Sequence, residues 1–362
     1  MFKFLAQEFV NQYGFLNLFN FITFRVGASI LTSLFFSLIF GQFIINKLSK
    51  IQPNGQPIRN DGPQTHIIKK AGTPTMGGVL IILSIFSSSV LWSDLYNSFV
   101  WIGLLALISF GFIGIIDDYN KVKSNSSNGL KAITRIILQI VFSLIISLVI
   151  LKMLDDQIDT TISFPFFKNL IINFGYFYLL ISLFILVGSA NAVNLTDGLD
   201  GLAIVPVMIV AMTFAFIAYV SGNVVFSEYL LINYIPGTGE LSVLCGALIG
   251  SALGFLWFNA PPAKVFMGDT GSLALGATLG SIALMVKHEI VLAIAGGLFV
   301  LETMSVVIQV ISFKLTGKRV FRMAPLHHHY EKKGWSEPTI VIRFWIITFV
   351  LALLSLATLK IR

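Results

Sequence analysis

Charged residues and cysteine are scarce in this chain of 362 residues. Asp, Glu, Lys and Arg together make up 11% of the sequence, whereas a soluble domain carries about 25%. So few polar side chains cannot cover the surface of a water-soluble protein of this size, which excludes an ordinary cytosolic enzyme and a disordered protein. The single cysteine, Cys245, excludes an intramolecular disulfide and a metal site built from several thiolates.

Hydrophobic residues dominate instead, at 56% of the chain with 33 Phe and a mean hydropathy of +0.87. A membrane-spanning helix needs about 20 mostly apolar residues. Because a lipid-exposed backbone must satisfy its own hydrogen bonds, we expect an all-α integral membrane protein that forms one polytopic domain over 1–362. The ten predicted spans are 22–46, 76–93, 99–116, 133–152, 171–190, 202–221, 241–258, 270–286, 290–313 and 339–360.

Basic residues concentrate in alternate breaks between these spans. The breaks 47–75, 117–135, 191–201, 259–269 and 314–338 contain 16 of the 24 Lys and Arg residues. Lys and Arg accumulate in cytoplasmic loops, so this face is predicted to be cytoplasmic, and an even number of spans places both termini outside. The net charge of +7 is then a matter of topology and does not indicate nucleic-acid binding.

Five aspartates lie at span ends on this predicted cytoplasmic face. They are Asp117 and Asp118 after the third span, Asp197 and Asp200 between the fifth and sixth, and Asp269 before the eighth. One such aspartate could be a helix cap, but carboxylates at this depth are costly and usually functional. Adjacent carboxylates need a cation or a proton to coexist, and hard oxygen ligands suit Mg²⁺ or Mn²⁺. Five aspartates from three loops favour a site.

The neighbours of these aspartates indicate phosphate chemistry. Glycines in the same loops let backbone N–H groups approach an anion, and helix N-termini favour negative charge; they are Gly198, Gly201, Gly268 and Gly271. The segment 72–78, Gly-Thr-Pro-Thr-Met-Gly-Gly, resembles a phosphate-binding turn in composition and follows Lys70, although small residues also mark close helix packing.

Two further features of the predicted cytoplasmic loops have competing interpretations. The segment 325–330, Pro-Leu-His-His-His-Tyr, invites a zinc site, but three adjacent side chains cannot all face one ion. Hydrogen bonds to phosphate or sugar are the better interpretation. Phe266 is placed to stack on a base, with core or lipid packing as the alternative.

These residues together carry a resemblance to the phospho-N-acetylmuramoyl-pentapeptide transferase family, over about Phe21 to Arg362. The motifs are Lys70-Ala-Gly-Thr-Pro-Thr-Met-Gly-Gly78, Phe112-Ile-Gly-Ile-Ile-Asp-Asp-Tyr119, Asn191-Ala-Val-Asn-Leu-Thr-Asp-Gly-Leu-Asp-Gly-Leu202, Asn259-Ala-Pro-Pro-Ala-Lys-Val-Phe-Met-Gly-Asp-Thr-Gly-Ser272 and Met323-Ala-Pro-Leu-His-His-His-Tyr-Glu331. The resemblance implies transfer of phospho-MurNAc-pentapeptide from UDP-MurNAc-pentapeptide to undecaprenyl phosphate, which gives lipid I and UMP. It also implies Mg²⁺ dependence, ten spans, a homodimer, and a site facing the cytoplasm from the bacterial plasma membrane.

Site roles follow from the same resemblance. Asp269 matches the Mg²⁺ ligand, and Asp117 and Asp118 match the pair near the metal and the lipid phosphate. His327 and His328 match catalytic positions near the substrate phosphates and sugar. The nucleotide pocket corresponds to Asn194, Asp197, Asp200, Asn259 and Phe266, and further pocket positions correspond to Lys70, Thr75 and Gln309. One departure is the segment 123–129, which is more polar and less basic than is usual in the family.

Adjacent residues of a helix point about 100° apart, so Asp117 and Asp118 are predicted to differ in role. One is expected to face the metal and phosphates, and the other to orient Lys121, Lys123 or a loop backbone group. Asp117 is predicted to lie nearest the acceptor phosphate. A direct displacement is favoured over a covalent aspartyl intermediate, because the acceptor phosphate is already nearly ionised at neutral pH; the sequence leaves both open.

Two other functions compete with this one. A sister enzyme that transfers GlcNAc-1-phosphate to a polyprenyl phosphate would share the aspartate motifs, but the 325–331 and 72–78 segments argue against it. An ion-coupled transporter would place ionisable residues near mid-span, and only Glu302 is well inside one. Internal repeats common in transporters are not evident, and a hydrogen bond between helices is the preferred role for Glu302.

Overall fold

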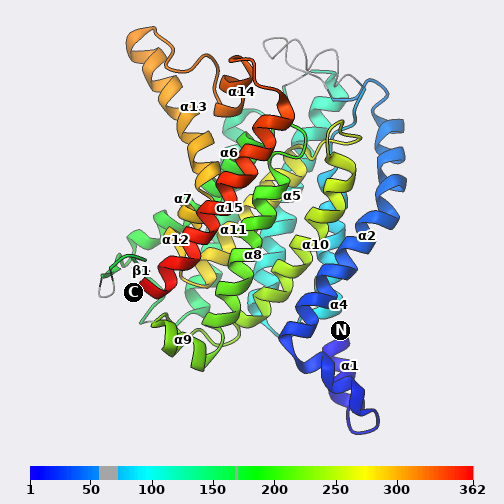
Figure 1. Ribbon diagram of the computed structural model, residues 1–362, viewed down its shortest axis with the longest axis vertical. Helices are drawn as coiled ribbons and strands as arrows, with labels where there is room; N and C mark the ends of the chain where they lie inside the picture. Colours follow the sequence, from blue (N-terminus) through cyan, green and yellow to red (C-terminus); the bar gives the residue numbers. More distant parts are fainter. Residues whose placement is uncertain (57–71, 127, 156, 168–169, 362) are drawn as a thin grey trace.

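The computed structural model describes residues 1–361 apart from 57–71, 127, 156 and 168–169, and the described chain is mostly helical (Figure 1). The α-helices are α1 (Phe2–Phe9), α2 (Ile22–Ile51), α4 (Gly78–Trp92), α5 (Ser98–Ser124), α6 (Ala132–Met153), α7 (Phe177–Thr196), α8 (Ile204–Ser221), α9 (Val224–Leu230), α10 (Leu241–Asn259), α11 (Gly268–Met285), α12 (Glu289–Ala295), α13 (Gly297–Thr316), α14 (Leu326–Glu331) and α15 (Glu337–Ile361). Two 3₁₀ segments are η1 (Gly14–Asn20) and η2 (Thr238–Glu240).

Eight helical segments are long and apolar enough to cross a membrane. They are α2, α5, α6, α7, α8, η2 with α10, α13 and α15. Of the ten predicted spans, the two that do not meet this description are 76–93 and 270–286, which correspond to the 15-residue α4 and to α11. The all-helical membrane architecture is confirmed, and the number of crossings stays a prediction.

Helix α11 is less apolar than a lipid-facing span because it lies inside the bundle. Every residue from Thr270 to Met285 is buried, so the helix needs small side chains for close packing more than lipid-facing ones. A Cβ at Gly276 would lie 2.4 Å from the carbonyl oxygen of Ser189 on α7, and one at Gly78 of α4 would lie 2.1 Å from the amide nitrogen of Gly271. Helices α4, α5 and α7 therefore pack directly against α11.

The predicted span 290–313 was wrong in one respect, because the chain there forms two helices. Helix α12 ends at Ala295 and α13 begins at Gly297, with Gly296 between them. A pair of glycines weakens helix continuity, and such pairs are a common cause of sharp kinks. A Cβ at Gly296 would also lie only 2.8 Å from the carbonyl oxygen of Leu292.

A short hairpin departs from the all-α prediction. Strands β1 (Thr161–Ser163) and β2 (Ile171–Asn173) pair antiparallel, with Ile162 opposite Ile172. Residues 171–176, predicted to open the fifth span, therefore precede α7 as a strand and turn. Only backbone outside the lipid has this freedom, because water can satisfy the unpaired strand edges.

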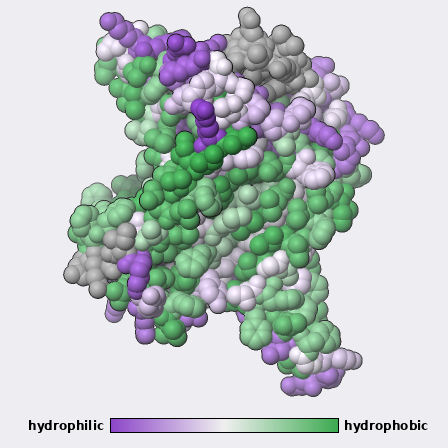
Figure 2. Space-filling view, viewed as in Figure 1, coloured by the Kyte–Doolittle hydropathy of each residue, from purple (hydrophilic) through white to green (hydrophobic). Residues whose placement is uncertain are grey.

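The surface carries an apolar belt between two polar ends (Figure 2). Large apolar side chains are exposed along the outer helices, for example Ile133, Ile137 and Leu148 on α6. Figure 1 shows α14 and the ends of α2 and α13 at the upper end, with α1, α9 and both chain termini towards the lower end. The distribution is that of a protein whose middle faces lipid.

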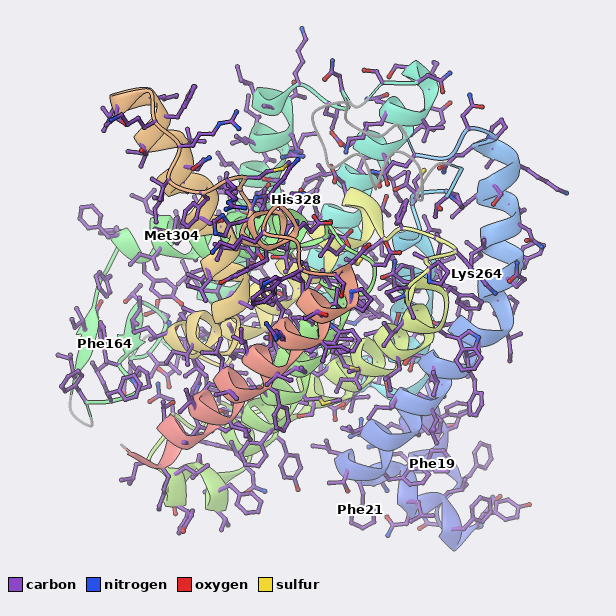
Figure 3. The ribbon with its side chains drawn as sticks, turned by 45° about the horizontal axis from the view of Figure 1, so that its top comes forward. Phe19, Phe21, Phe164, Lys264, Met304 and His328 are labelled. Carbon is purple, nitrogen blue, oxygen red and sulfur yellow. The ribbon has the colours of Figure 1, made fainter. Side chains whose placement is uncertain are left out.

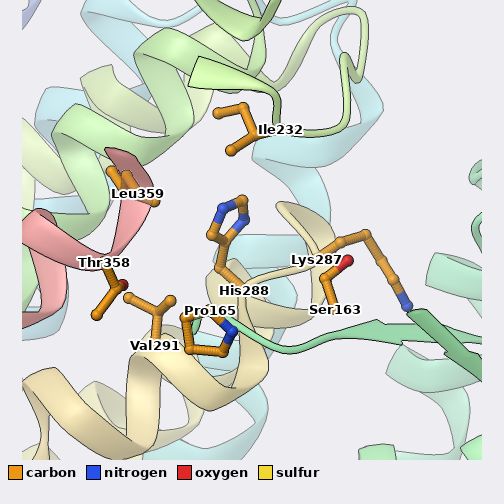
Figure 4. A pocket seen from close by; sticks show the side chains of 8 residues that line it. All are labelled: Ser163, Pro165, Ile232, Lys287, His288, Val291, Thr358 and Leu359. Carbon is orange, nitrogen blue, oxygen red and sulfur yellow. The ribbon is translucent and has the colours of Figure 1, made fainter. Parts of the chain in front are cut away.

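Two buried cations at the lower end, Arg25 and Lys287, have close oxygen partners. Arg25 on α2 donates two hydrogen bonds of 2.6 Å to the carboxylate of Glu240. Figure 4 shows a small cavity at the corner between α11 and α12, lined by Lys287 and His288 among others. Lys287 is buried there and donates to the carbonyl oxygen of Asp159 at 2.9 Å. This cavity follows the C-terminal end of α11, whereas Asp269 lies in its first turn, about 27 Å away at 1.5 Å per residue.

Candidate active site

Three carboxylates meet where α5 ends and α11 begins. Asp117 and Asp118 lie near the C-terminal end of α5 and are 2% and 1% exposed, and Asp269 lies in the first turn of α11. Each offers an oxygen within 4.8 Å of the others. Gly114 makes the approach possible, because a Cβ at this position would lie 2.3 Å from the carbonyl oxygen of Asp269. Three of the five aspartates predicted to share one face therefore converge.

Asp118 organises the start of α11. Its Oδ1 accepts the backbone N–H of Asp269 at 3.2 Å, and its Oδ2 accepts the N–H and hydroxyl of Thr270 at 3.0 and 2.8 Å. The carboxylate thus caps free N–H groups of a helix that follows it by about 150 residues. Gly268 precedes the turn with φ +72°, and a Cβ there would lie 2.5 Å from Asp118 Oδ2.

Asp117 has different partners from its neighbour, as the helical geometry predicted, but Lys121 and a loop N–H are the partners expected of the residue that does not face the metal and phosphates. That Asp117 lies nearest the acceptor phosphate stays a prediction. Asp117 Oδ1 accepts the backbone N–H of Leu130 at 2.7 Å, and its Oδ2 lies 2.6 Å from Lys121 Nζ. Gly129 leaves room for this contact, since a Cβ there would lie 2.5 Å from Asp117 Oδ1. Asp117 therefore joins the polar segment after α5 to the carboxylate cluster.

Two basic side chains offset part of the negative charge of the cluster. Lys121 Nζ lies 2.8 Å from Asp269 Oδ2 and 3.8 Å from Asp118 Oδ1, in addition to its contact with Asp117. Arg135 Nη1, from the first turn of α6, lies 3.3 Å from Asp269 Oδ2. Asn194 on α7 donates to Asp269 Oδ1 at 2.6 Å and to Ser272 Oγ at 2.8 Å. Helices α5, α6 and α7 thus each supply a side chain that contacts Asp269 on α11.

Sequence reasoning missed Arg135 as a site residue. Lys121 carried a local signal, because it follows Asp117 by four residues on one helix and such pairs face each other. Arg135 carried none, since its proximity to Asp269, 134 residues away, depends on how α6 packs beside α5.

Several predicted nucleotide-pocket residues join two loops beside the cluster. Asn259 Oδ1 accepts the N–H of Gly201 at 3.0 Å, and its Nδ2 donates to the carbonyl oxygen of Val265 at 2.9 Å. Asp200 Oδ2 accepts the N–H of Ala263 at 3.0 Å. These bonds hold the loop after α7 against the loop after α10.

The segment that contains Thr75 is hydrogen-bonded to the loop after α10, which carries Phe266. The N–H of Phe266 donates to the carbonyl oxygen of Pro74, and its own carbonyl accepts from Gly77, both at 2.9 Å. The phenyl ring is partly exposed. Thr75 is buried, and its N–H donates to Gln52 Oε1 at 2.9 Å. Lys70, predicted for the same segment, lies outside the described residues.

The three consecutive histidines point to different partners. His327 is buried, with its backbone N–H and its Nδ1 each 3.2 Å from an oxygen of Glu302. His328 Nδ1 lies 2.6 Å from Glu331 Oε2. His329 Nδ1 accepts the N–H of Arg322 at 3.1 Å. Figure 3 shows His328 near the middle of this end of the molecule, with Lys264 to one side. The preferred role of Glu302, a hydrogen bond between helices, is confirmed.

The surroundings of His329 disfavour the protonated form of its ring. Partial desolvation and the nearby Lys333 and Arg322 lower the pKa of His329 below its usual range. This direction agrees with the contact to Arg322, in which an unprotonated Nδ1 accepts the backbone N–H.

Two further predicted site residues, Gln309 and Asp197, lie on α13 and at the end of α7. Gln309 on α13 donates to the carbonyl oxygen of Phe321 at 3.0 Å and accepts the N–H groups of Val320 and Phe321. Asp197 is partly exposed and follows the last turn of α7. His327 approaches the same loop, because a Cβ at Gly198 would lie 2.2 Å from His327 Nε2.

Comparison with known proteins identifies the family. The model of glycosyl transferase family 4 matches residues 100–287, and signature 1 of phospho-N-acetylmuramoyl-pentapeptide-transferase matches residues 70–82. The phospho-N-acetylmuramoyl-pentapeptide-transferase of Pelagibacter ubique (strain HTCC1062) is 58% identical over 358 residues, covering 99% of each chain. The enzyme of that name from Rhodopseudomonas palustris (strain BisA53) is 55% identical over 355 residues, covering 98% of each chain.

The chain belongs to the phospho-N-acetylmuramoyl-pentapeptide transferase family.

This membership confirms the resemblance drawn from the motifs. The family model spans α5 to the end of α11 and so includes all three clustered carboxylates, Lys121, Arg135 and Asn194. The transferase signature covers the segment that contacts Phe266 and Gly271 through Gly77 and Gly78. The parts of the chain matched by the family are thus the parts that pack around the carboxylate cluster.

Proposed function

We propose that the chain transfers phospho-MurNAc-pentapeptide from UDP-MurNAc-pentapeptide to undecaprenyl phosphate, giving lipid I and UMP. Full-length relatives named for this transferase support the proposal. The observation that carries it structurally is the cluster of Asp117, Asp118 and Asp269 with Lys121 and Arg135, at the polar end of apolar helices. A hydrophilic and a lipid substrate can meet only at such a boundary.

The reaction exchanges one phosphoanhydride bond for another. An oxygen of undecaprenyl phosphate attacks the β-phosphorus of the UDP-sugar, the bond to the bridging oxygen breaks, and UMP leaves with that oxygen. Two anions must approach, so neutralisation of negative charge dominates the barrier. Lys121, already in contact with the carboxylates, supplies positive charge. Asp117, which contacts Lys121 and a loop N–H, is the proposed acceptor of the remaining proton of the acceptor phosphate.

The donor set fits Mg²⁺. Hard carboxylate oxygens from two helices within 4.8 Å of one another are the ligands that this ion prefers. Asp269 is the proposed ligand, with Asn194 orienting it and Asp117 and Asp118 beside it. When bound, the ion supplies positive charge to the phosphates and to the leaving UMP. Asp118 shapes the turn through its three hydrogen bonds to Asp269 and Thr270.

The neighbouring loops are proposed to bind the rest of the sugar nucleotide. Phe266 is partly exposed beside the cluster, and its backbone is fixed at both ends, which suits a ring that stacks on uracil. His327 and His328 come from α14, which Glu302 contacts through the N–H of His327, and are assigned to the sugar and phosphates. The remaining proposed pocket residues are Lys70, Thr75, Asn194, Asp197, Asp200, Asn259 and Gln309.

The proposed setting is the bacterial plasma membrane, with the site facing the cytoplasm. Ten spans, termini on the outer side, a single domain over 1–362 and a homodimer complete the proposal. The arrangement in Figure 1 supports the topology, because α14 and the two termini lie towards opposite ends. The loops richest in Lys and Arg include the segment around α14.

An assay with two sugar nucleotides tests the function. Purified protein with undecaprenyl phosphate and Mg²⁺ should release UMP from UDP-MurNAc-pentapeptide and leave UDP-GlcNAc unreacted. Reaction with UDP-GlcNAc alone would favour the GlcNAc-1-phosphate sister enzyme, and no release from either would refute the proposal.

A further inference from the structure

Arg135 and Lys121 both contact Asp269, but they differ in the number of their contacts and in their exposure. Lys121 contacts all three carboxylates and its side chain is 18% exposed. Arg135 makes one contact, 3.3 Å long, to the oxygen of Asp269 that Lys121 also approaches, and its side chain is 29% exposed. A partly exposed single ion pair is weak and can exchange. A divalent cation that binds Asp269 therefore competes first with Arg135.

The guanidinium of Arg135 has a hydrogen-bond donor that could bind an anion. Its Nε is buried and has no hydrogen-bond partner among the described residues. A guanidinium carries five donors in a planar fork that matches phosphate oxygens in pairs. The N-terminal turn of α6, where Arg135 lies, adds the partial positive charge of free N–H groups.

The position of Arg135 selects a lipid phosphate over a soluble one. Its neighbours on the first turns of α6, Ile133, Ile136 and Ile137, are 73%, 47% and 55% exposed and belong to the apolar belt. Arg135 thus stands between the carboxylate cluster and the lipid-facing side of α6. An isoprenoid chain can lie along those isoleucines while its phosphate reaches the guanidinium.

We propose that Arg135 binds the phosphate of the acceptor lipid, and that this contact replaces its ion pair with Asp269 when a divalent cation takes that carboxylate. The inference rests on the proposed function in taking the acceptor to be a polyprenyl phosphate. It makes Arg135 a residue that couples metal binding to acceptor binding: the cation frees the guanidinium, and the lipid phosphate then occupies it.

Binding measurements on the full-length protein in detergent, without UDP-sugar, test this coupling. Mn²⁺ affinity is followed by electron paramagnetic resonance in the absence of lipid. Affinity for undecaprenyl phosphate and for undecaprenol is followed by native mass spectrometry with Mg²⁺ present. The variants are Arg135→Gln and Arg135→Lys, with Lys131→Gln as the matched control, because Lys131 is an exposed cation one turn away.

Arg135→Gln should bind Mn²⁺ about threefold more tightly, because a competing cation has gone. It should bind undecaprenyl phosphate about tenfold more weakly, the loss expected for a hydrogen bond to a charged group. Its affinity for undecaprenol, which lacks the phosphate, should be unchanged. Arg135→Lys should fall between, since it keeps the charge and loses the fork, and Lys131→Gln should match the wild type in every assay.

Three results would overturn the proposal: unchanged phosphate affinity in Arg135→Gln, an equal loss for undecaprenol, or unchanged or weaker Mn²⁺ binding. Thermal unfolding checks that each variant is folded, and Arg135→Lys keeps the test available if Arg135→Gln is unstable. Because no turnover is measured, the outcome is independent of the UMP assay. A protein that shows the coupling and releases no UMP would refute the proposed function and leave this inference standing.

Discussion

Asp117 and Asp118 are chemically identical neighbours whose surroundings separate their roles. Asp118 accepts three hydrogen bonds from the first turn of α11, whereas Asp117 contacts Lys121 and the N–H of Leu130. Side chains one position apart on a helix point about 100° apart, so one reaches the neighbouring helix and the other the following loop. The contacts of Asp118 are structural, and Asp117 is the residue proposed for proton transfer.

Asn variants should separate these roles. In Asp118→Asn the amide nitrogen must face N–H or O–H donors, which costs about 1–3 kcal/mol when buried, so the melting temperature should fall along with activity. Asp117→Asn can still accept from Leu130, and should keep its melting temperature while losing rate. Thermal unfolding and UMP release measured on both variants check this.

The pH dependence of Asp117→Asn is informative as well. If Asp117 is the base, the loss should be largest at low pH, where more acceptor phosphate keeps its second proton, and should partly recover as pH rises. A covalent nucleophile would give no recovery at any pH, and the wild type would exchange UMP with UDP-sugar without lipid. Identical losses and profiles for the two Asn variants would contradict the division of roles.

Phe266 gives a prediction about binding rather than chemistry. An aromatic pair contributes about 0.5–1.5 kcal/mol beyond burial, so Phe266→Ala should raise KM for the UDP-sugar several-fold and leave kcat nearly unchanged. Steady-state kinetics with undecaprenyl phosphate held saturating measures both. A lower kcat at constant KM would show that the ring does not hold the base.

At the scale of elements, the start of α11 depends on glycine for two separate reasons. Gly268 has φ +72°, which disfavours any residue with a Cβ, and that Cβ would lie 2.5 Å from Asp118 Oδ2 and 2.6 Å from Thr75 Oγ1. Gly317, after α13, has nearly the same φ, +69°, but nothing within 4 Å of the added atom. The two positions share the backbone strain and differ in crowding.

Alanine at these two glycines therefore separates strain from crowding. Gly317→Ala should cost about 1–2 kcal/mol of backbone energy and leave turnover intact. Gly268→Ala should cost more and abolish most activity, because it displaces the Asp118 carboxylate that caps α11. The measurements are melting temperature and UMP release; similar activity in both variants would mean that the turn tolerates crowding.

Sequence patterns predicted where the helices lie better than they predicted the breaks between and within them. Apolar windows placed helices at 76–93 and 270–286, where α4 and α11 lie, and the motifs pointed to five aspartates, three of which converge. The break at Gly296 was missed because apolar residues continue on both sides of it. The β1–β2 hairpin was missed because three-residue strands are too short to show a period of two.

For the whole molecule, the limit of sequence reasoning is tertiary contact. Asn194 and Asp269 are 75 residues apart and bonded at 2.6 Å, a contact that only the packing of α7 on α11 creates. Arg135 enters the site by the packing of α6. Sequence motifs identify the loops that contain catalytic candidates, and the packing of the helices determines which of their side chains are in contact.

Topology is testable with thiol labelling, because Cys245 is the only cysteine and is fully buried. Tyr176 and Lys333 are exposed. Lys333 lies in a loop predicted to be cytoplasmic, and Tyr176 precedes α7 at the end of that helix predicted to lie outside. With an impermeant reagent, Lys333→Cys should label only in inside-out vesicles and Tyr176→Cys only in right-side-out ones. Labelling of both from one side would contradict the proposed orientation.

The central claim is that the carboxylate cluster is the catalytic centre of lipid I synthesis, and Asp269→Asn tests it most directly. The amide keeps the shape and loses the charge that Lys121 and Arg135 contact and that the metal requires. The measurement is UMP release from UDP-MurNAc-pentapeptide with undecaprenyl phosphate and Mg²⁺, compared with the wild-type protein. The melting temperatures of the variant and the wild type are compared to check that the variant is folded. We expect a rate reduced more than about a hundredfold, as when a contact to transition-state charge is lost. A folded variant that keeps more than about a tenth of the wild-type rate would contradict the account.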